Sequence, residues 1–302
     1  MKEKIDKINA LKKEKNAVIM AHYYVKDEIH EVADYIGDSY FLSEKATQVD
    51  ADTIILCGVS FMGEGAKILN QKKTVLMPDA TADCPMAHMA SAESIAKVRE
   101  KYNDVAVVCY VNSNAELKRN ADVCVTSSNA LKIVKSLPNK YIYFIPDKNL
   151  GRYVAEQVPE KEFIFNDGCC PVHAKLTKED VLKAKEAHPD AVLLVHPECE
   201  KEVVELAEYA GSTAGIISYA KASDKMEFII GTELGVMCEL RKNNPEKKFY
   251  PLTEDLICPD MKKITLDKII NSLEHNTYEV KLEEQFAKEA HAPLVRMLEL
   301  AK

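Results

Sequence analysis

The 302-residue sequence has no tryptophan, only 10 glycines and 12 prolines, and no apolar segment that could span a membrane. Such low glycine and proline contents exclude collagen-like and low-complexity chains. The longest apolar runs, at 104–111 and 191–195, fall far short of the roughly 20 residues that a transmembrane helix needs. The N-terminal segment carries charges throughout and lacks the apolar core of a signal peptide, so we expect a cytoplasmic protein.

Positive charge is also scarce. The chain has 40 basic and 48 acidic side chains, for a formal net charge of −8, and only five of the basic residues are arginines. Binding to nucleic acid depends largely on basic residues at phosphates, so this balance disfavours nucleic acid as the partner. We expect an anionic ligand to be held by hydroxyls, helix ends and histidines rather than by guanidinium groups.

Short β-branched segments alternate with helical patterns along the whole chain. The candidate strands are 17–21, 53–57, 74–77, 105–110, 122–126, 141–145, 162–165, 191–195, 214–217, 227–230 and 247–250. Helical patterns between them include 91–102, 129–136 and 177–187, the last beginning with a capping-box pair at Thr177 and Asp180. Apolar strands separated by helices are typical of α/β folds with parallel sheets.

Three series of residues repeat with a period of about 87 residues. The series are the strand segments 18–24, 107–113 and 193–199, the serines Ser39, Ser127 and Ser212, and the cysteines Cys84, Cys170 and Cys258. A shared period implies a threefold internal repeat, and its length suits a small α/β domain rather than a solenoid unit. We therefore predict an α/β protein with three similar three-layer α/β/α domains, each with a parallel sheet, in a pseudo-threefold arrangement.

The repeat also predicts the domain boundaries. The first domain covers 1–86, the second 87–171 and the third 172–260. The remaining segment, 261–302, is predicted to form helices that pack back on the first domain. No glycine- or serine-rich linker separates the repeats, so we expect the domains to pack around a common axis.

The cysteine series predicts a metal centre. Cys84, Cys170 and Cys258 are each followed by proline, and no other cysteine is. Ligands bind at the carboxyl ends of parallel strands, so three inward-facing domains would bring the three thiols together. Three thiolates suit a soft metal or a [4Fe–4S] cluster that keeps one iron open as a Lewis acid. The alternatives are buried core cysteines, or zinc with three thiolates and a water, although zinc-type C-x₂-C pairs are absent.

Titratable side chains follow the ends of the repeated strands. His196 and Glu198 lie two residues apart at a strand end, where both side chains face the same way, and they form a candidate acid–base pair. His22 and Tyr24, then Tyr110 and Asn112, follow the two equivalent strands, and His173 lies three residues after Cys170. The serines precede helical patterns. There they are either anion contacts or ordinary helix caps.

Nine short motifs between residues 22 and 261 occur in an order that identifies a family. They are HYY, GDS, YVNSNAELK, VTSSNA, GCCPVH, HPEC, GSTAG, GTELG and CPDM. This series resembles the quinolinate synthase family of bacterial NAD biosynthesis. The resemblance implies condensation of iminoaspartate with dihydroxyacetone phosphate to quinolinate, with loss of phosphate and two waters. It also implies a functional link to an aspartate oxidase or dehydrogenase that supplies iminoaspartate.

The resemblance further implies roles for individual residues. It places a [4Fe–4S] cluster on Cys84, Cys170 and Cys258, with Cys169 as a competitor for Cys170. Implied catalytic residues are Tyr24, Tyr110, His173 and Glu198, and implied substrate contacts are His22, Ser39, Tyr110, Asn112, Ser127, His196, Ser212 and Thr213. Met62 is expected to line the pocket. Some members pair the third cysteine with one three residues earlier, but that position is Asp255 here, so no disulfide switch is expected.

Two other functions fit the same cysteine pattern. A different cluster-dependent hydro-lyase would use the open iron on a hydroxy acid, and a non-enzymatic iron–sulfur sensor would need no substrate pocket. A structural zinc protein is a third alternative, and it would be colourless and indifferent to oxygen.

Overall fold

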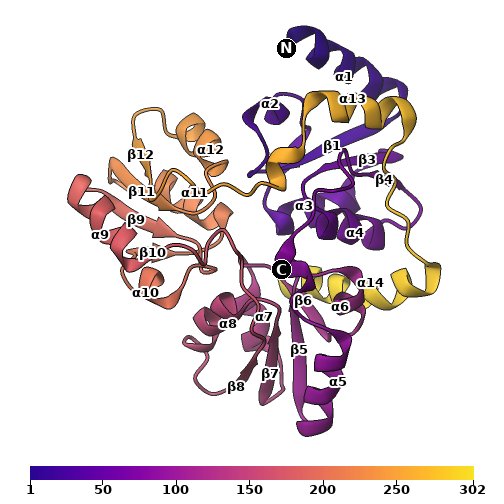
Figure 1. Ribbon diagram of the computed structural model, residues 1–302. Coiled ribbons are helices and arrows are strands. Elements are labelled where there is room, and N and C mark those ends of the chain that lie inside the picture. Colours follow the sequence, from indigo (N-terminus) through magenta and orange to yellow (C-terminus); the bar gives the residue numbers. More distant parts are fainter.

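The computed structural model describes residues 1–302 and contains three four-stranded parallel sheets with flanking helices, arranged around a common centre (Figure 1). We call the parts built on these sheets the first, second and third lobes. The predicted fold class is confirmed. No helix in the structure combines the length and apolar character needed to cross a membrane.

Each sheet has the same strand order. The first contains β1 (Ala17–His22), β2 (Tyr35–Gly37), β3 (Thr53–Cys57) and β4 (Thr74–Leu76). The second contains β5 (Val105–Tyr110), β6 (Val123–Val125), β7 (Tyr141–Ile145) and β8 (Glu162–Phe165). The third contains β9 (Val192–Val195), β10 (Tyr209–Ala210), β11 (Glu227–Gly231) and β12 (Lys248–Pro251). In all three the order is second, first, third, fourth strand, as a threefold internal repeat requires.

The helices connect the strands and add a C-terminal pair. They are α1 (Lys2–Glu14), α2 (Asp27–His30), α3 (Ser39–Gln48), α4 (Ser60–Leu69), α5 (Ala92–Lys101), α6 (Ala115–Arg119), α7 (Ala130–Ser136), α8 (Lys148–Ala155), α9 (Lys178–Ala187), α10 (Lys201–Val204), α11 (Thr213–Ala222), α12 (Val236–Asn243), α13 (Leu266–His275) and α14 (Glu284–Leu300), with 3₁₀ turns at Pro85–His88 and Met261–Lys263. The predicted capping box of α9 is present, since the side chains of Thr177 and Asp180 bond reciprocally.

The predicted strand at 214–217 is wrong, because these residues lie inside α11. The Ser212 side chain caps that helix by accepting the N–H of Gly215 at 3.1 Å. Ile216 and Ala220, four residues apart, are buried on one helical face. The sequence prediction also missed β2 and β10, which are edge strands of three and two residues.

The hydrophobic core is not divided equally among the lobes. One cluster of 58 buried residues runs through the first and second lobes and the C-terminal helices. The third lobe instead has two separate clusters, of 11 and 10 buried residues, on the two faces of its sheet. The first two lobes therefore form one packed body, and polar contacts such as Tyr153 Oη to Ala210 O (2.9 Å) join the third lobe to it.

The C-terminal helices pack differently from the prediction for 261–302. Helix α13 packs on α1, but α14 packs mainly against α6 and β6 of the second lobe, and also against α4. Its buried residues Ala287, Ala290, Leu294 and Met297 form an apolar stripe at helical spacing. The stripe covers the second lobe, so the assignment of this whole segment to the first domain is wrong for α14.

Candidate functional site

A cavity of about 120 Å³ lies where the three lobes meet. The carboxyl ends of β1, β5 and β9 open onto it, so the three repeats contribute equivalent positions. The predicted site residues in its lining are His22, Tyr24, Ser39, Cys84, Tyr110, Asn112, Ser127, Cys170, His173, His196, Glu198, Thr213 and Cys258.

Two residues expected at the pocket lie elsewhere. Ser212 is buried, but its hydroxyl caps α11 and it does not line the cavity. Met62 lines a separate, smaller cavity beside the main one. Of the three serines in the repeat, only Ser39 and Ser127 therefore line the cavity.

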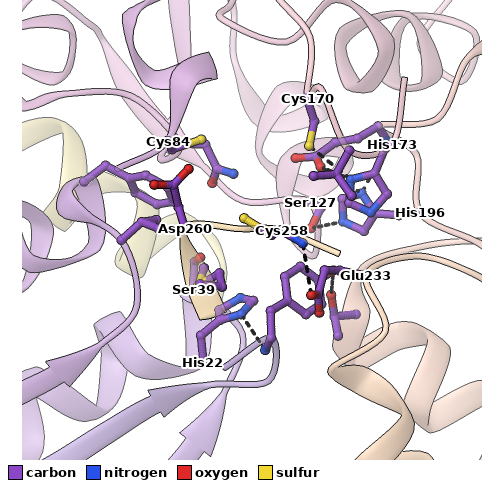
Figure 2. A pocket seen from close by; sticks show the side chains of 18 of the residues that line it. His22, Ser39, Cys84, Ser127, Cys170, His173, His196, Glu233, Cys258 and Asp260 are labelled. Carbon is purple, nitrogen blue, oxygen red and sulfur yellow. Dashed lines mark hydrogen bonds and ion pairs between the residues drawn. The ribbon is translucent and has the colours of Figure 1, made fainter. Parts of the chain in front are cut away.

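The three cysteines of the repeat face a common space from different lobes, as Figure 2 shows. Burial and the nearby Glu198 carboxylate raise the pKa of Cys84 to about 12 and raise the pKa of Cys170 well above its usual range. Burial also raises the pKa of Cys258. Thiols in this setting stay protonated unless a cation offsets the thiolate charge. The donor set therefore fits a metal group held by three thiolates.

A mixed donor set overlaps the three-cysteine set. The ligand atoms of Cys170, His173 and Glu198 lie within 4.8 Å of one another and could hold a single metal ion. However, Nδ1 of His173 already lies 2.8 Å from Oε2 of Glu198. A metal bound to that nitrogen would have to break this contact, which favours the three-cysteine set.

Two histidines at equivalent strand ends have the same tautomer for the same reason. The backbone N–H of Tyr24 donates to Nδ1 of His22 at 3.1 Å, and the N–H of Glu198 donates to Nδ1 of His196 at 3.3 Å. Each neutral ring therefore carries its proton on Nε2. In His196 this Nε2–H donates to Oγ of Ser127 at 3.2 Å (Figure 2).

Burial keeps both of these imidazoles uncharged at neutral pH. Burial, together with His30 and Lys262, lowers the pKa of His22 to about 3. Burial also lowers the pKa of His196 to about 4, against the opposing effect of Glu198. The two rings are thus neutral hydrogen-bond donors, which can hold an anion without adding a positive charge.

A chain of hydrogen bonds crosses the cavity wall from the first lobe to the third. The hydroxyl of Tyr24 lies 2.6 Å from Oγ1 of Thr213 and 2.8 Å from Oγ1 of Thr232. Oγ1 of Thr232 in turn lies 2.9 Å from Nε2 of His173, whose Nδ1 faces Glu198. With a proton on His173 Nδ1, the Thr232 hydroxyl donates to Nε2, and the chain can carry a proton from phenol to carboxylate.

Glu198 is the buried carboxylate of this chain. Burial opposes its ionisation, but His196, His173 and the hydroxyl of Tyr110 outweigh burial and lower its pKa to about 2. Its other oxygen, Oε1, has no hydrogen-bond partner, and neither has the buried Oδ1 of Asn112. Unpaired buried acceptors are costly, so a ligand that donates to both atoms would remove this cost.

Burial also opposes ionisation of the two phenols, and here no neighbouring group outweighs it. It raises the pKa of Tyr24 well above its usual range, despite hydrogen bonds to two threonines. Burial and the neighbouring Glu198 do the same for the pKa of Tyr110. Both tyrosines are therefore protonated at neutral pH and can act as donors or general acids.

Sequence reasoning missed several residues of the site. The carboxylate of Glu233 accepts the N–H groups of Cys258 (3.2 Å) and Gly235 (2.6 Å) and lies 3.0 Å from Lys262 Nζ. Asp260 accepts the N–H of Asp83, the residue before Cys84, and so ties two cysteine loops together. Thr232 and Glu233 follow β11, and Asp260 follows Cys258 by two residues. Their positions at or near strand ends are the sequence feature that could have identified them as site residues.

Comparison with known proteins agrees with this geometry. Residues 6–299 match the family model described as quinolinate synthetase A protein. The chain is 53% identical over 300 residues to a quinolinate synthase of Caldicellulosiruptor saccharolyticus, covering 99% of each chain. It is 48% identical over 295 residues to one of Clostridioides difficile, covering 98% of this chain and 97% of the relative. A third, from Fusobacterium nucleatum, is 50% identical over 296 residues, covering 98% and 99%.

Proposed function

The chain belongs to the quinolinate synthetase A family and is an enzyme of this kind, and on this premise we propose its reaction. Iminoaspartate condenses with dihydroxyacetone phosphate to give quinolinate, one phosphate and two waters. The observation that carries the proposal is that three cysteines from three lobes face the same cavity as the Tyr24–Thr232–His173–Glu198 chain.

The cofactor in this proposal is a [4Fe–4S] cluster on Cys84, Cys170 and Cys258. The donor set supports it, because buried neutral thiols that face one space become thiolates when a metal group offsets their charge. When bound, such a cluster supplies an iron without a protein ligand, which is a Lewis acid toward a substrate hydroxyl or carboxylate.

Neutral donors of the chain hold the anionic groups of the substrates. His22, His196, Ser39 and Ser127 supply imidazole N–H and hydroxyl groups from all three lobes. Ser39 is also the first residue of α3, where the helix N-terminus favours an anion. Because these groups carry no full charge, phosphate can leave the cavity once it has been cleaved from the substrate.

The proton chain performs the acid–base work of this proposal. Formation of the aromatic ring requires removal of carbon-bound protons and protonation of leaving hydroxyls. The ionised Glu198 accepts protons through His173, and Tyr24 and Tyr110 donate them as phenols. Oδ1 of Asn112 and Oε1 of Glu198 orient the substrate by accepting its N–H or O–H groups.

The direct test uses protein purified and reconstituted without oxygen. Iminoaspartate is generated in the assay by an aspartate oxidase or dehydrogenase, the class of partner that the proposal requires in the cytoplasm. We expect about four irons and four sulfides per chain, and quinolinate and phosphate in equal amounts. Protein with a full cluster that makes no quinolinate from these substrates would contradict the proposal. A product from a hydroxy acid instead would point to another hydro-lyase.

A further inference from the structure

Lys118 is the only buried lysine or arginine in the protein, with 1% of its surface exposed. It lies on α6, and its Nζ donates to the carbonyl oxygens of Ser113 (2.6 Å) and Phe61 (3.1 Å). Nζ also lies 5.5 Å from the centre of the Phe61 ring. Lys118 forms no ion pair, so its positive charge is buried without a counter-ion.

An unpaired buried charge is costly, and a hydrogen-bonding role alone does not account for it. A neutral side chain could donate to the same carbonyls without the cost of burying an ion. Lysines are rarely buried unless they are paired. The missing counter-ion therefore points to an anion that the protein binds.

The position of Lys118 indicates where that anion binds. Its side chain lines a small cavity together with Ser39 and Phe61, and these two residues also line the main cavity. Lys118 thus shares the lining of this small cavity with Ser39, which begins α3. The helix N-terminus and the ammonium group both contribute positive potential there.

The charges of the main cavity strengthen this reasoning. Its lining contains four carboxylates, Asp38, Glu198, Glu233 and Asp260, but no lysine or arginine. Each carboxylate has a local partner: Asp38 accepts the N–H of Phe41, and the other three contact His173, Lys262 and Lys263. Unlike Lys262 and Lys263, which pair with Glu233 and Asp260, Lys118 has no carboxylate partner and donates only to two backbone carbonyls.

We propose that Lys118 is an electrostatic positioning residue for the phosphate-bearing substrate. Its ammonium group holds Phe61 and Ser113 at the junction of the first two lobes, and it adds positive potential that strengthens the binding of an anion by the neutral donors at Ser39. This inference rests on the proposed function, because that function supplies the phosphate-bearing ligand.

Two substitutions separate the charge from the hydrogen bonds. Lys118→Gln keeps an amide donor for the carbonyls but removes the charge, and Lys118→Arg keeps the charge. Lys247→Gln is the matched control, because Nζ of Lys247 also donates to two carbonyls, of Ala220 and Ser223 (both 2.6 Å), and lies 5.6 Å from the Phe228 ring, away from the cavity.

The measurements are the Kd for inorganic phosphate, by titration calorimetry under anaerobic conditions, and the KM for dihydroxyacetone phosphate. We expect both to rise about tenfold in Lys118→Gln, which corresponds to about 1.4 kcal/mol, with kcat changing less. Lys118→Arg and Lys247→Gln should stay within about threefold of the wild type. Phosphate should compete with dihydroxyacetone phosphate, which places it in the main cavity.

Several outcomes would overturn the inference. They are a Lys118→Gln protein with wild-type phosphate affinity, a wild-type protein that binds no phosphate, and an Arg variant weakened as much as the Gln variant. If Lys118→Gln does not fold, Lys118→Arg decides the question. If Lys118 acted only by holding the two carbonyls in place, the larger guanidinium would disturb them and phosphate binding would weaken. The titration needs no turnover. A protein that makes no quinolinate would therefore contradict the proposed function, while phosphate binding still decides for or against Lys118.

Discussion

The hydroxyl of Tyr24, which follows β1, lies 2.8 Å from Oγ1 of Thr232, which follows β11. The two residues are 208 positions apart and belong to the first and third lobes. The third lobe has hydrophobic clusters of its own, so this hydrogen bond joins two separately packed bodies. The bond thus couples the packing of the third lobe against the first to the hydrogen-bond chain that continues through His173.

Replacing Tyr24 by Phe should remove this coupling with little change in shape. We expect kcat to fall by roughly 10²-fold, since a positioned acid–base group contributes about 10²–10⁴-fold, with KM changing less. Steady-state kinetics on the anaerobically reconstituted enzyme measure the changes in kcat and KM separately. Tyr153→Phe is the control, because the Tyr153 hydroxyl also bridges two lobes, to Ala210 O, but lies outside the cavity. Equal activity losses in the two variants would contradict a specific role for Tyr24.

The adjacent pair Cys169 and Cys170 provides a second prediction. Cys170 lines the cavity, whereas Cys169 does not, and the backbone N–H of Cys169 donates to the sulfur of Met89 at 3.4 Å. Cys170→Ser should therefore lose most of its iron and its absorption near 400 nm, and Cys169→Ser should keep the wild-type content of about four irons. Iron and sulfide analysis after anaerobic reconstitution checks this. Iron loss in Cys169→Ser alone would reverse the assignment.

Gly235 marks a close contact between the first and third lobes. A Cβ atom at this position would lie 2.6 Å from Cα of Tyr24 and 2.7 Å from the carbonyl oxygen of Tyr23. Gly235→Ala should push these lobes apart, destabilise the protein by about 1–3 kcal/mol, and lower kcat. Gly65→Ala is the matched control in α4, where a Cβ meets nothing within 4 Å. That variant should keep full activity and gain up to about 1 kcal/mol from helix propensity. Denaturant unfolding and kinetics measure both effects.

The serine series shows how far the sequence period could predict the site. Ser39 and Ser212 occupy equivalent positions in the repeat, but their helices begin differently. Asp38 caps α3, so Ser39 is free to line the cavity, whereas Ser212 itself caps α11. The period predicted the lobes and the three cysteines because those follow from strand order. A serine at this position faces the cavity only if the residue before it caps the helix. The repeat does not determine which of the two residues is the cap.

Contacts between residues far apart in the chain could not be predicted from the sequence, for a different reason. Thr232 and Lys262 bond to Tyr24 of the first lobe, from more than 200 positions away along the chain. Glu233 accepts the N–H of Cys258 within the third lobe, where the chain segments after β11 and β12 come together. Lys118 lies in one of the motifs that identified the family, yet its significance comes from burial without a counter-ion. Neither property is encoded in local pattern or spacing.

Burial of His196 predicts a specific dependence of stability on pH. Its pKa is about 4 in the folded protein, while an unfolded histidine has a pKa of about 6.5. Between these values the unfolded chain binds a proton that the folded chain excludes, so the free energy of unfolding falls as the pH is lowered from 6.5 to 4. The contribution of this one group between pH 7 and pH 5 is about 2 kcal/mol.

His196→Asn isolates this contribution, because the Asn oxygen can still accept the N–H of Glu198 but does not titrate. Denaturant unfolding of the metal-free protein at pH 7 and pH 5 should show a loss of stability about 2 kcal/mol smaller in the variant than in the wild type. Titrating groups that do not interact with His196 are shared by both proteins and cancel in the comparison. His275→Asn, at an exposed position, should follow the wild type. If His196→Asn also follows the wild type, His196 is charged in the folded protein, and its ring cannot serve as the neutral donor to Ser127 that anion binding requires.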